Sequence, residues 1–146
     1  MLKKVQLKIE SQIENLDERG SVCDNTEHSA DTHTGAMKIF GNAISLSFRE
    51  NTESGSVFSD ILIHESGAVT VRRSGAIDST MYFKEGEEYN TVYSLPPYKF
   101  DMTVKTEMVK NSLSIFGGTL EISYSMSVGG ADKRVKMRID VSEVQK

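Results

Sequence analysis

Hydrophobic and polar residues alternate with a period of two along most of this chain, which is typical of β-strands with one buried face. The clearest example is the run 4–14, in which Val5, Leu7 and Ile9 share one face while lysine, glutamine and glutamate occupy the other. The same alternation returns near residues 98–105. No segment has the 3.6-residue period of a helix. The pattern therefore predicts an all-β protein.

Glycine, proline and asparagine separate the alternating runs at short and even intervals. Gly41-Asn42, Gly75 and the adjacent Pro96-Pro97 are examples. About ten strands result, and their connections are short, so strands that follow each other in sequence are expected to be neighbours. This predicts an up-and-down antiparallel meander closed into a lipocalin-like β-barrel, with residues 1–146 as one domain. The segment 15–35 is polar and has the weakest pattern.

The run 113–128 changes its hydrophobic parity partway along. Leu113 and Ile115 occupy odd positions, whereas Leu120 and Ile122 occupy even ones, and Gly117-Gly118 lies between them. A slip of one residue turns every side chain to the opposite face, and a glycine bulge can absorb it. We therefore expect one long strand with a bulge at the glycine pair.

Composition narrows the class of protein further. The 146 residues include 38% hydrophobic and 26% charged residues, with a net charge of −4. That balance favours a folded globular domain and argues against a nucleic-acid partner. No apolar run is long enough for a secretion signal or a membrane span, and the single cysteine, Cys23, excludes an internal disulfide. A cytoplasmic protein without a membrane partner is expected.

Several stretches together resemble a known family. They are ISLSFRE (44–50), TVRRSG (70–75), YSLPPY (93–98) and GGTLEISY (117–124). In order and spacing they are similar to the YwiB-like family of bacterial β-barrel proteins, also called domain of unknown function 1934. The resemblance implies a calycin-type barrel of about eight to ten strands, related to lipocalins and fatty-acid-binding proteins. It implies no ligand, because a fold does not settle a function. The Gly-x-Trp of lipocalins is absent, since the chain has no tryptophan. The arginine-and-tyrosine carboxylate clamp of fatty-acid-binding proteins has no counterpart, because Arg134 and Arg138 alternate outward.

A charged pair stands out within the predicted barrel interior. Glu50 continues the apolar face of its strand, and so does Arg73, two strands further on. Both lie near strand ends, so they should meet at the same mouth of the barrel, together with Tyr93 and Tyr98. One interpretation is a structural ion pair that plugs the mouth. The other is that Arg73 binds an anionic ligand and the tyrosines orient it.

Other residue types add less to the functional hypotheses. Phe48 and Met126 fall on apolar faces and are candidates for the wall of a binding site, although the interior could equally be filled by side chains. His28, Asp31 and His33 do not share one face, so no metal site is expected. Cys23 lies beside Asp24, which disfavours a thiolate. Neither a catalytic site nor a cofactor is predicted, and we expect no enzyme.

Two functions remain open from the sequence. The first is a barrel that binds a small or hydrophobic ligand at its mouth through Glu50, Arg73, Tyr93 and Tyr98. The second is a filled barrel that serves as a structural or protein-interaction module, through its outer face or through residues 15–35. The oligomeric state is not predicted.

Overall fold

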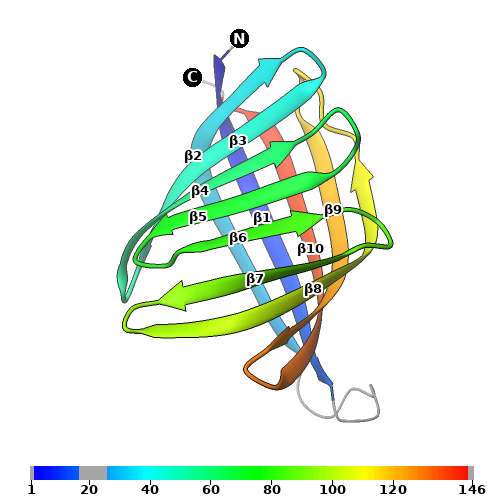
Figure 1. The fold of residues 1–146 in the computed structure, drawn as a ribbon. Coiled ribbons are helices and arrows are strands. Elements are labelled where there is room, and N and C mark those ends of the chain that lie inside the picture. The colour runs from blue at the N-terminus through cyan, green and yellow to red at the C-terminus, as the bar shows by residue number, and fades with distance from the viewer. Residues whose placement is uncertain (1, 17–25, 145–146) are drawn as a thin grey trace.

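The computed structural model describes residues 2–16 and 26–144, and these residues form β-strands joined by turns (Figure 1). The strands are β1 (Leu2–Leu16), β2 (Glu27–Phe40), β3 (Ala43–Thr52), β4 (Gly55–Ile63), β5 (Val69–Gly75), β6 (Ser79–Phe83), β7 (Glu88–Leu95), β8 (Tyr98–Asn111), β9 (Gly118–Val128) and β10 (Ala131–Glu143). Within the described residues, no helix is long and apolar enough to cross a membrane. The all-β prediction is confirmed.

All ten strands belong to one antiparallel sheet with the order β6-β5-β4-β3-β2-β1-β10-β9-β8-β7. The first strand lies between β2 and β10, which brings both ends of the chain to the same side of the molecule (Figure 1). The outer strands β6 and β7 meet through one bridge, in which Asp78 and Ser94 exchange two backbone hydrogen bonds of 2.8 Å. The sheet therefore curls into a nearly closed up-and-down barrel, as the sequence predicts.

The alternation of the sequence is preserved across the sheet apart from one register shift in β8, so each regular stretch of strand sends one parity of residues into the barrel. The fully buried side chains come from strands all around the barrel, and they include Val5, Leu46, Ile63, Val104 and Leu120. Across the interior, the ring of Phe83 packs on that of Tyr124 with centroids 4.7 Å apart.

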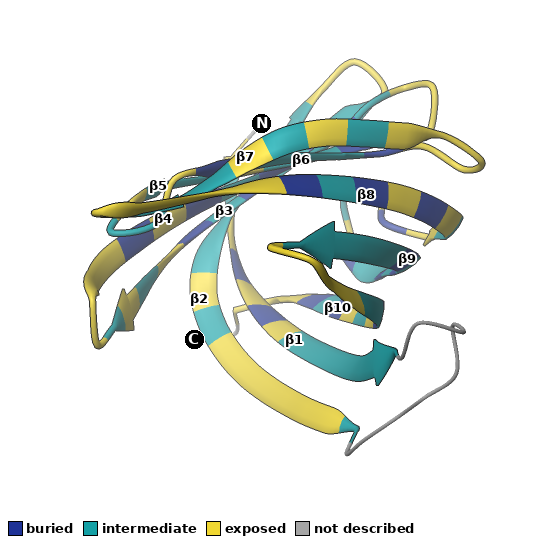
Figure 2. Cartoon of the chain, turned by 60° about the horizontal axis from the view of Figure 1, so that its bottom comes forward, coloured by how far each residue is buried: buried dark blue, intermediate teal, exposed yellow. Residues whose placement is uncertain are grey.

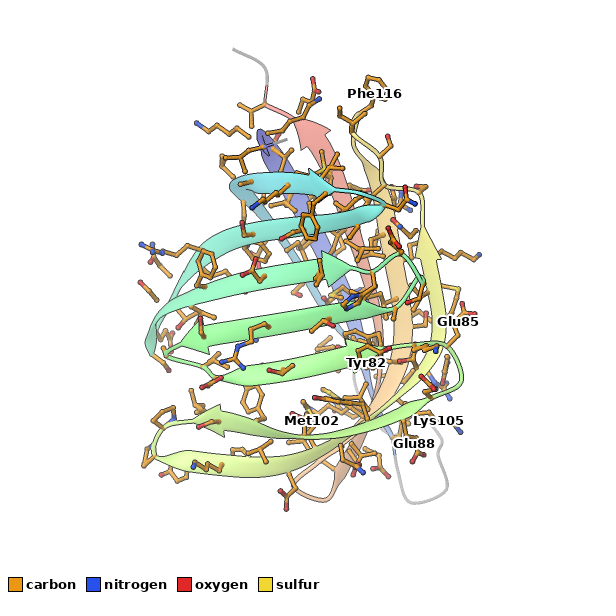
Figure 3. The ribbon with its side chains drawn as sticks, turned by 45° about the horizontal axis from the view of Figure 1, so that its top comes forward. Tyr82, Glu85, Glu88, Met102, Lys105 and Phe116 are labelled. Carbon is orange, nitrogen blue, oxygen red and sulfur yellow. The ribbon has the colours of Figure 1, made fainter. Side chains whose placement is uncertain are left out.

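The prediction of one bulged strand over 113–128 is wrong. Gly117 and Gly118 belong to a turn that links β8 to β9, and β9 begins only at Gly118. Both have left-handed φ angles, and a side chain on Gly118 would start 2.4 Å from the carbonyl oxygen of Ser112. The parity changes because the chain reverses at Ile115 and Phe116, directly before the glycine pair, and periodicity alone does not distinguish such a turn from a bulge. Phe116, 82% exposed, projects from this turn (Figure 3).

A register shift does occur in β8, between Thr106 and Met108. A bulge of this kind leaves backbone groups without their ladder partners. Here the N–H of Val109 donates to the Glu85 carboxylate at 2.8 Å, and the N–H of Gly86 donates to the carbonyl of Thr106. Glu85 lies in the turn between β6 and β7 (Figure 3), so the bulge docks that turn onto β8.

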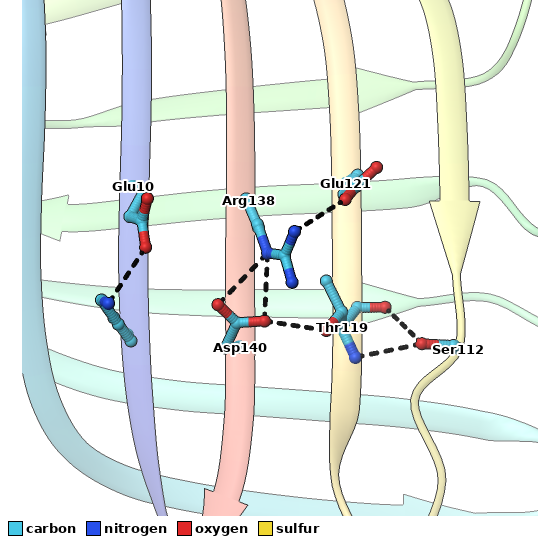
Figure 4. A network of polar contacts seen from close by, with 7 residues as sticks. Glu10, Ser112, Thr119, Glu121, Arg138 and Asp140 are labelled. Atoms are coloured by element: carbon cyan, nitrogen blue, oxygen red, sulfur yellow. Dashed lines mark hydrogen bonds and ion pairs between the residues drawn. The ribbon is translucent and has the colours of Figure 1, made fainter.

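The outer face of β9 and β10 carries a polar network (Figure 4). Thr119 donates a 2.8 Å hydrogen bond to Asp140, and Arg138 contacts both Asp140 and Glu121. Burial alone would raise the pKa of Asp140, but the hydrogen bonds from Thr119 and Arg138 lower it. Arg138 therefore points outward, as its place in the alternation predicts, and has no role inside the barrel.

Candidate functional site

The turns that join β3 to β4, β5 to β6 and β7 to β8 gather at one end of the barrel, which we call the mouth (Figure 1). Glu50 and Arg73 face inward near this end, from the last residues of β3 and β5. Their charged groups lie 3.8 Å apart, and about a quarter of each side chain is exposed, 25% for Glu50 and 27% for Arg73. The two side chains meet where the alternation and the meander place them.

Arg73 stands in a row of polar side chains that crosses three strands. Its direct neighbour in β4 is Ser59 and its direct neighbour in β6 is Ser79. Both serines are almost fully buried, with exposures of 2% and 3%. Their hydroxyl groups have no hydrogen-bond partner in the described part of the protein. Directly opposed residues of antiparallel strands lie about 5 Å apart, so both hydroxyls flank the base of the Arg73 side chain.

The Arg73 guanidinium keeps its hydrogen-bonding capacity. Its contact with Glu50, at 3.8 Å, is too long for a hydrogen bond, and Arg73 makes no hydrogen bond with the residues that the structure describes. A guanidinium has five N–H donors in a planar fork and no acceptor. Arg73 therefore has unused donors, and the two serine hydroxyls beside it have unused donors that are enclosed by protein.

Tyr124 of β9 is electrostatically coupled to this row. Burial raises the pKa of Tyr124 to about 12, and the positive charge of Arg73 opposes part of that shift. The phenol therefore stays neutral at physiological pH. Thr106, the direct neighbour of Tyr124 in β8, is also buried, and its hydroxyl has no partner among the described residues.

The remaining predicted site residues lie in different surroundings. Phe48 is buried and stacks on His33 with centroids 4.8 Å apart. Met126 and Tyr93 are partly buried against the core. Tyr98, 63% exposed, lies where β8 leaves the turn at the mouth. The structure thus brings Glu50 and Arg73 together, whereas Tyr98 has no described contact with them. A role of these residues in ligand binding remains a prediction.

The interior is less tightly filled on some strands than on others. Many inward apolar side chains are only partly buried although they face the centre of a barrel. They are Ile9, Ile13, Ile39, Val71, Met81, Tyr93, Val109, Met126, Val128 and Met137. These positions keep part of their apolar surface accessible to solvent.

A depression of about 650 Å³ lies elsewhere, across β1, β2, β9 and β10. Its lining consists mainly of charged and polar side chains of the outward parity, among them Glu10, Glu121 and Arg138. Arg138 is already paired with Glu121 at 3.4 Å, and Glu10 with Lys8 at 3.2 Å. Since these charges satisfy each other on an open surface, this depression is a weaker candidate than the interior row.

The histidines form no shared site. His64 is hydrogen-bonded to Thr70 at 2.8 Å, and His33 lies against Phe48. In the described residues, no three of His, Cys, Asp or Glu cluster in a way that could hold a metal ion. Cys23 and Asp24 lie outside the described residues.

Sequence analysis missed Ser59, Ser79 and Tyr124 as members of the site. Ser59 does interrupt the inward series Val57, Ile61 and Ile63, which is a visible signal. Its meaning depends on the register that sets it beside Arg73, and that register becomes clear only in the folded sheet.

Comparison with known proteins supports the fold and gives no information on a ligand or a reaction. A family model described as Domain of unknown function (DUF1934) matches residues 7–139. The crystal structure of ywiB protein from Bacillus subtilis is similar, with a TM-score of 0.86 and 24% identity. The match covers 99% of this chain and 94% of that chain, and at this identity it shows the fold alone. No curated protein matches the chain.

The raised pKa of Tyr124 predicts a late-titrating tyrosine. Absorbance of phenolate followed against pH should show a late phase near 12 that belongs to one of the five tyrosines. The folded state holds the Tyr124 proton more tightly than the unfolded state, so its contribution to stability is complete below about pH 10 and is lost as the pH rises towards 12. Tyr124→Phe should remove the late phase and that part of the stability loss. Ionisation of all tyrosines together near pH 10 in the folded protein would contradict the burial.

Proposed function

The chain belongs to the family described as Domain of unknown function (DUF1934), and on that premise we propose that its barrel binds a small amphipathic molecule with an oxyanion group. The oxyanion would lie against Arg73, and the apolar part of the ligand would occupy the interior. The observation that carries this proposal is the row Ser59–Arg73–Ser79, in which an arginine that makes no hydrogen bond within the described residues is flanked by two buried hydroxyls without partners there.

The donors of this row suit an oxyanion. The guanidinium can bind two oxygens of a carboxylate, phosphate or sulfonate at once, and each serine can donate one O–H. Charge-assisted hydrogen bonds of this kind are the stronger ones in proteins. The charge of Arg73 acts on the pKa of Tyr124, but the phenol stays neutral at physiological pH. Tyr124 therefore adds no negative charge that would repel a bound oxyanion.

The energetic argument concerns Ser59 and Ser79. A buried hydroxyl without a partner costs about 1–3 kcal/mol relative to a satisfied one. A barrel whose only requirement was shape would be more stable with small apolar residues at both positions. A ligand that accepts from these hydroxyls offsets that cost, so a binding role gives a physical reason for two such serines on either side of Arg73.

Glu50 has a supporting part in this proposal. An arginine directed into a barrel needs a counter-charge. The Glu50 carboxylate supplies it from 3.8 Å, at a distance that leaves the guanidinium donors unused. In the absence of ligand the pair is neutral, and when an anion binds, Glu50 opposes it by repulsion. Glu50 thereby limits the affinity for anions.

The apolar part of the ligand has accessible surface to contact. Val71 and Met81 are inward neighbours of the row on β5 and β6, and both are only partly buried. Met126 and Met137 face the same interior from β9 and β10 and are also partly buried. Methionine adapts to ligands of different shape, which suits an apolar wall.

The proposal is of a binding protein and not of an enzyme. Catalysis by a serine needs a base within hydrogen-bonding reach. Among the described residues, no histidine is hydrogen-bonded to a serine, and the serines flanking Arg73 have no partner at all. Arg73 and its neighbours can hold and orient an oxyanion but do not supply a general base.

Removing the guanidinium should abolish the preference for an anion. Anilinonaphthalene sulfonate and phenylnaphthylamine share one aromatic body, but only the first carries an oxyanion. Fluorescence titration should show tighter binding of the sulfonate to the native protein. Arg73→Ala should weaken sulfonate binding roughly 10- to 100-fold, because charge-assisted hydrogen bonds contribute about 1.5–3 kcal/mol. Binding of the uncharged probe should change little.

Arg72 offers a matched control for this experiment. It is the next residue in the chain but points outward, where it contacts Thr80 at 2.8 Å and Asp78 at 3.4 Å. Arg72→Ala removes the same charge from the other face of the sheet and should leave both affinities unchanged. An equal loss of sulfonate binding in the two variants, or no loss in either, would contradict the proposal.

The two serines should show opposite effects on stability and on binding. Ser59→Ala and Ser79→Ala each delete a buried hydroxyl without a partner, so each should raise the free energy of unfolding by roughly 1 kcal/mol. The same variants should bind the sulfonate probe several-fold more weakly. Urea unfolding and fluorescence titration measure the two quantities on one sample. A serine variant that is both less stable and equally good at binding would assign the hydroxyls a purely structural role.

A further inference from the structure

One part of the sheet has an unpaired edge. Strand β2 pairs with β1 from Glu27 to Lys38, but its ladder with β3 covers only Ala36–Phe40. Residues 27–35 therefore have no strand partner on the side away from β1, within the described part of the chain. From Glu27 to Thr32 every residue is exposed, on both faces of the strand. Figure 2 shows this exposed stretch at the border of the molecule.

The β2–β3 ladder ends beside a close approach of the two strands at Gly35. At Gly35 the strands approach so closely that a Cβ atom would lie 2.2 Å from the carbonyl oxygen of Ser47. Beyond this point β3 continues in its ladder with β4, from Phe48 to Thr52, while β2 stays with β1. The backbone groups of the first half of β2 are thus left at an edge by the geometry of the barrel.

This edge has little of the usual protection against another strand. Natural edges are blocked by charged side chains, above all lysine, by proline, by bulges or by being very short. Glu27 and Asp31 are the only carboxylates in the stretch 27–34. The stretch 27–34 contains no lysine, arginine or proline, and its ladder with β1 has no register shift. It offers a regular row of backbone donors and acceptors over eight residues.

We propose that this edge pairs antiparallel with the same edge of a second copy of the chain, around a two-fold axis at Ala30. Two identical strands related by an axis normal to the sheet keep the same residues on each face, so Ala30 faces the partner's Ala30. In this register Glu27 lies opposite the partner's His33, and Asp31 lies opposite the partner's Ser29. Neither acidic residue faces another acidic residue.

Neighbouring registers are less favourable because of charge. With the axis at Ser29, Glu27 would lie opposite the partner's Asp31. With the axis at Asp31, the two Asp31 side chains would oppose each other. Like charges directly opposite on adjacent strands are destabilising, so Glu27 and Asp31 disfavour these two registers relative to the axis at Ala30. This inference does not depend on the proposed ligand.

Cross-linking tests the register directly. In a Cys23→Ser background, Ala30→Cys places two thiols next to each other across the axis, and mild oxidation should give a covalent dimer. Thr32→Cys is the matched control, because it is exposed on the same face but lies about 13 Å from its copy in this register. Cross-linking of Ala30→Cys alone is the expected result. Equal cross-linking of both variants, or of neither, would overturn the proposal.

Sedimentation velocity over a concentration series tests the association itself. The native protein should shift from monomer to dimer as its concentration rises. Ala30→Lys brings two ammonium groups together at the axis and should remain monomeric with an unchanged circular dichroism spectrum, whereas Ala30→Ser should dimerise like the native chain. A native protein that stays monomeric at every soluble concentration, or a dimer that Ala30→Lys leaves intact, would overturn the proposal. A protein that stays monomeric and binds a different protein at this edge would overturn the proposal as well.

Discussion

The backbone ladder of the barrel decides which side chains enter its interior. Because pleated strands alternate their side chains strictly, the register of β4, β5 and β6 leaves no freedom in where Ser59, Arg73 and Ser79 point. The same constraint brings Glu50 across to Arg73 and sets Tyr124 beside Thr106. A polar side chain on the inward parity points into the barrel even where its burial is unfavourable. Other side chains or a ligand must then supply its hydrogen-bond or ion-pair partners.

Much of the fold follows from the sequence alone. The period of two, the short turns and the absence of helical runs predict an antiparallel up-and-down barrel, and inward charges at Glu50 and Arg73 predict that the two side chains meet. Gly117-Gly118 shows the limit, because a turn and a bulge shift the parity of the pattern alike. Ser59 and Ser79 show a second limit, since a serine in an apolar series becomes informative only when the register sets it beside Arg73.

The proposed binding role rests on two features of the interior. One is the set of hydroxyls without partners around an arginine that makes no hydrogen bond in the described chain. The other is the group of inward methionine, isoleucine and valine side chains that remain partly exposed. Both features lower stability, and both are expected of a protein that binds an amphipathic molecule. The unpaired edge of β2 is a separate property, and it begins at Gly35, next to the end of the β2–β3 ladder.

Native mass spectrometry of protein purified gently from cell extract, compared with the same sample after denaturation, tests the central claim most directly. The proposed interior site predicts a reproducible excess mass on the native chain that disappears on denaturation and is reduced in Arg73→Ala but kept in Arg72→Ala. The released molecule should carry an acidic oxygen group and an apolar part. A native protein with the bare polypeptide mass that also binds charged and uncharged probes equally would contradict an oxyanion site in the barrel.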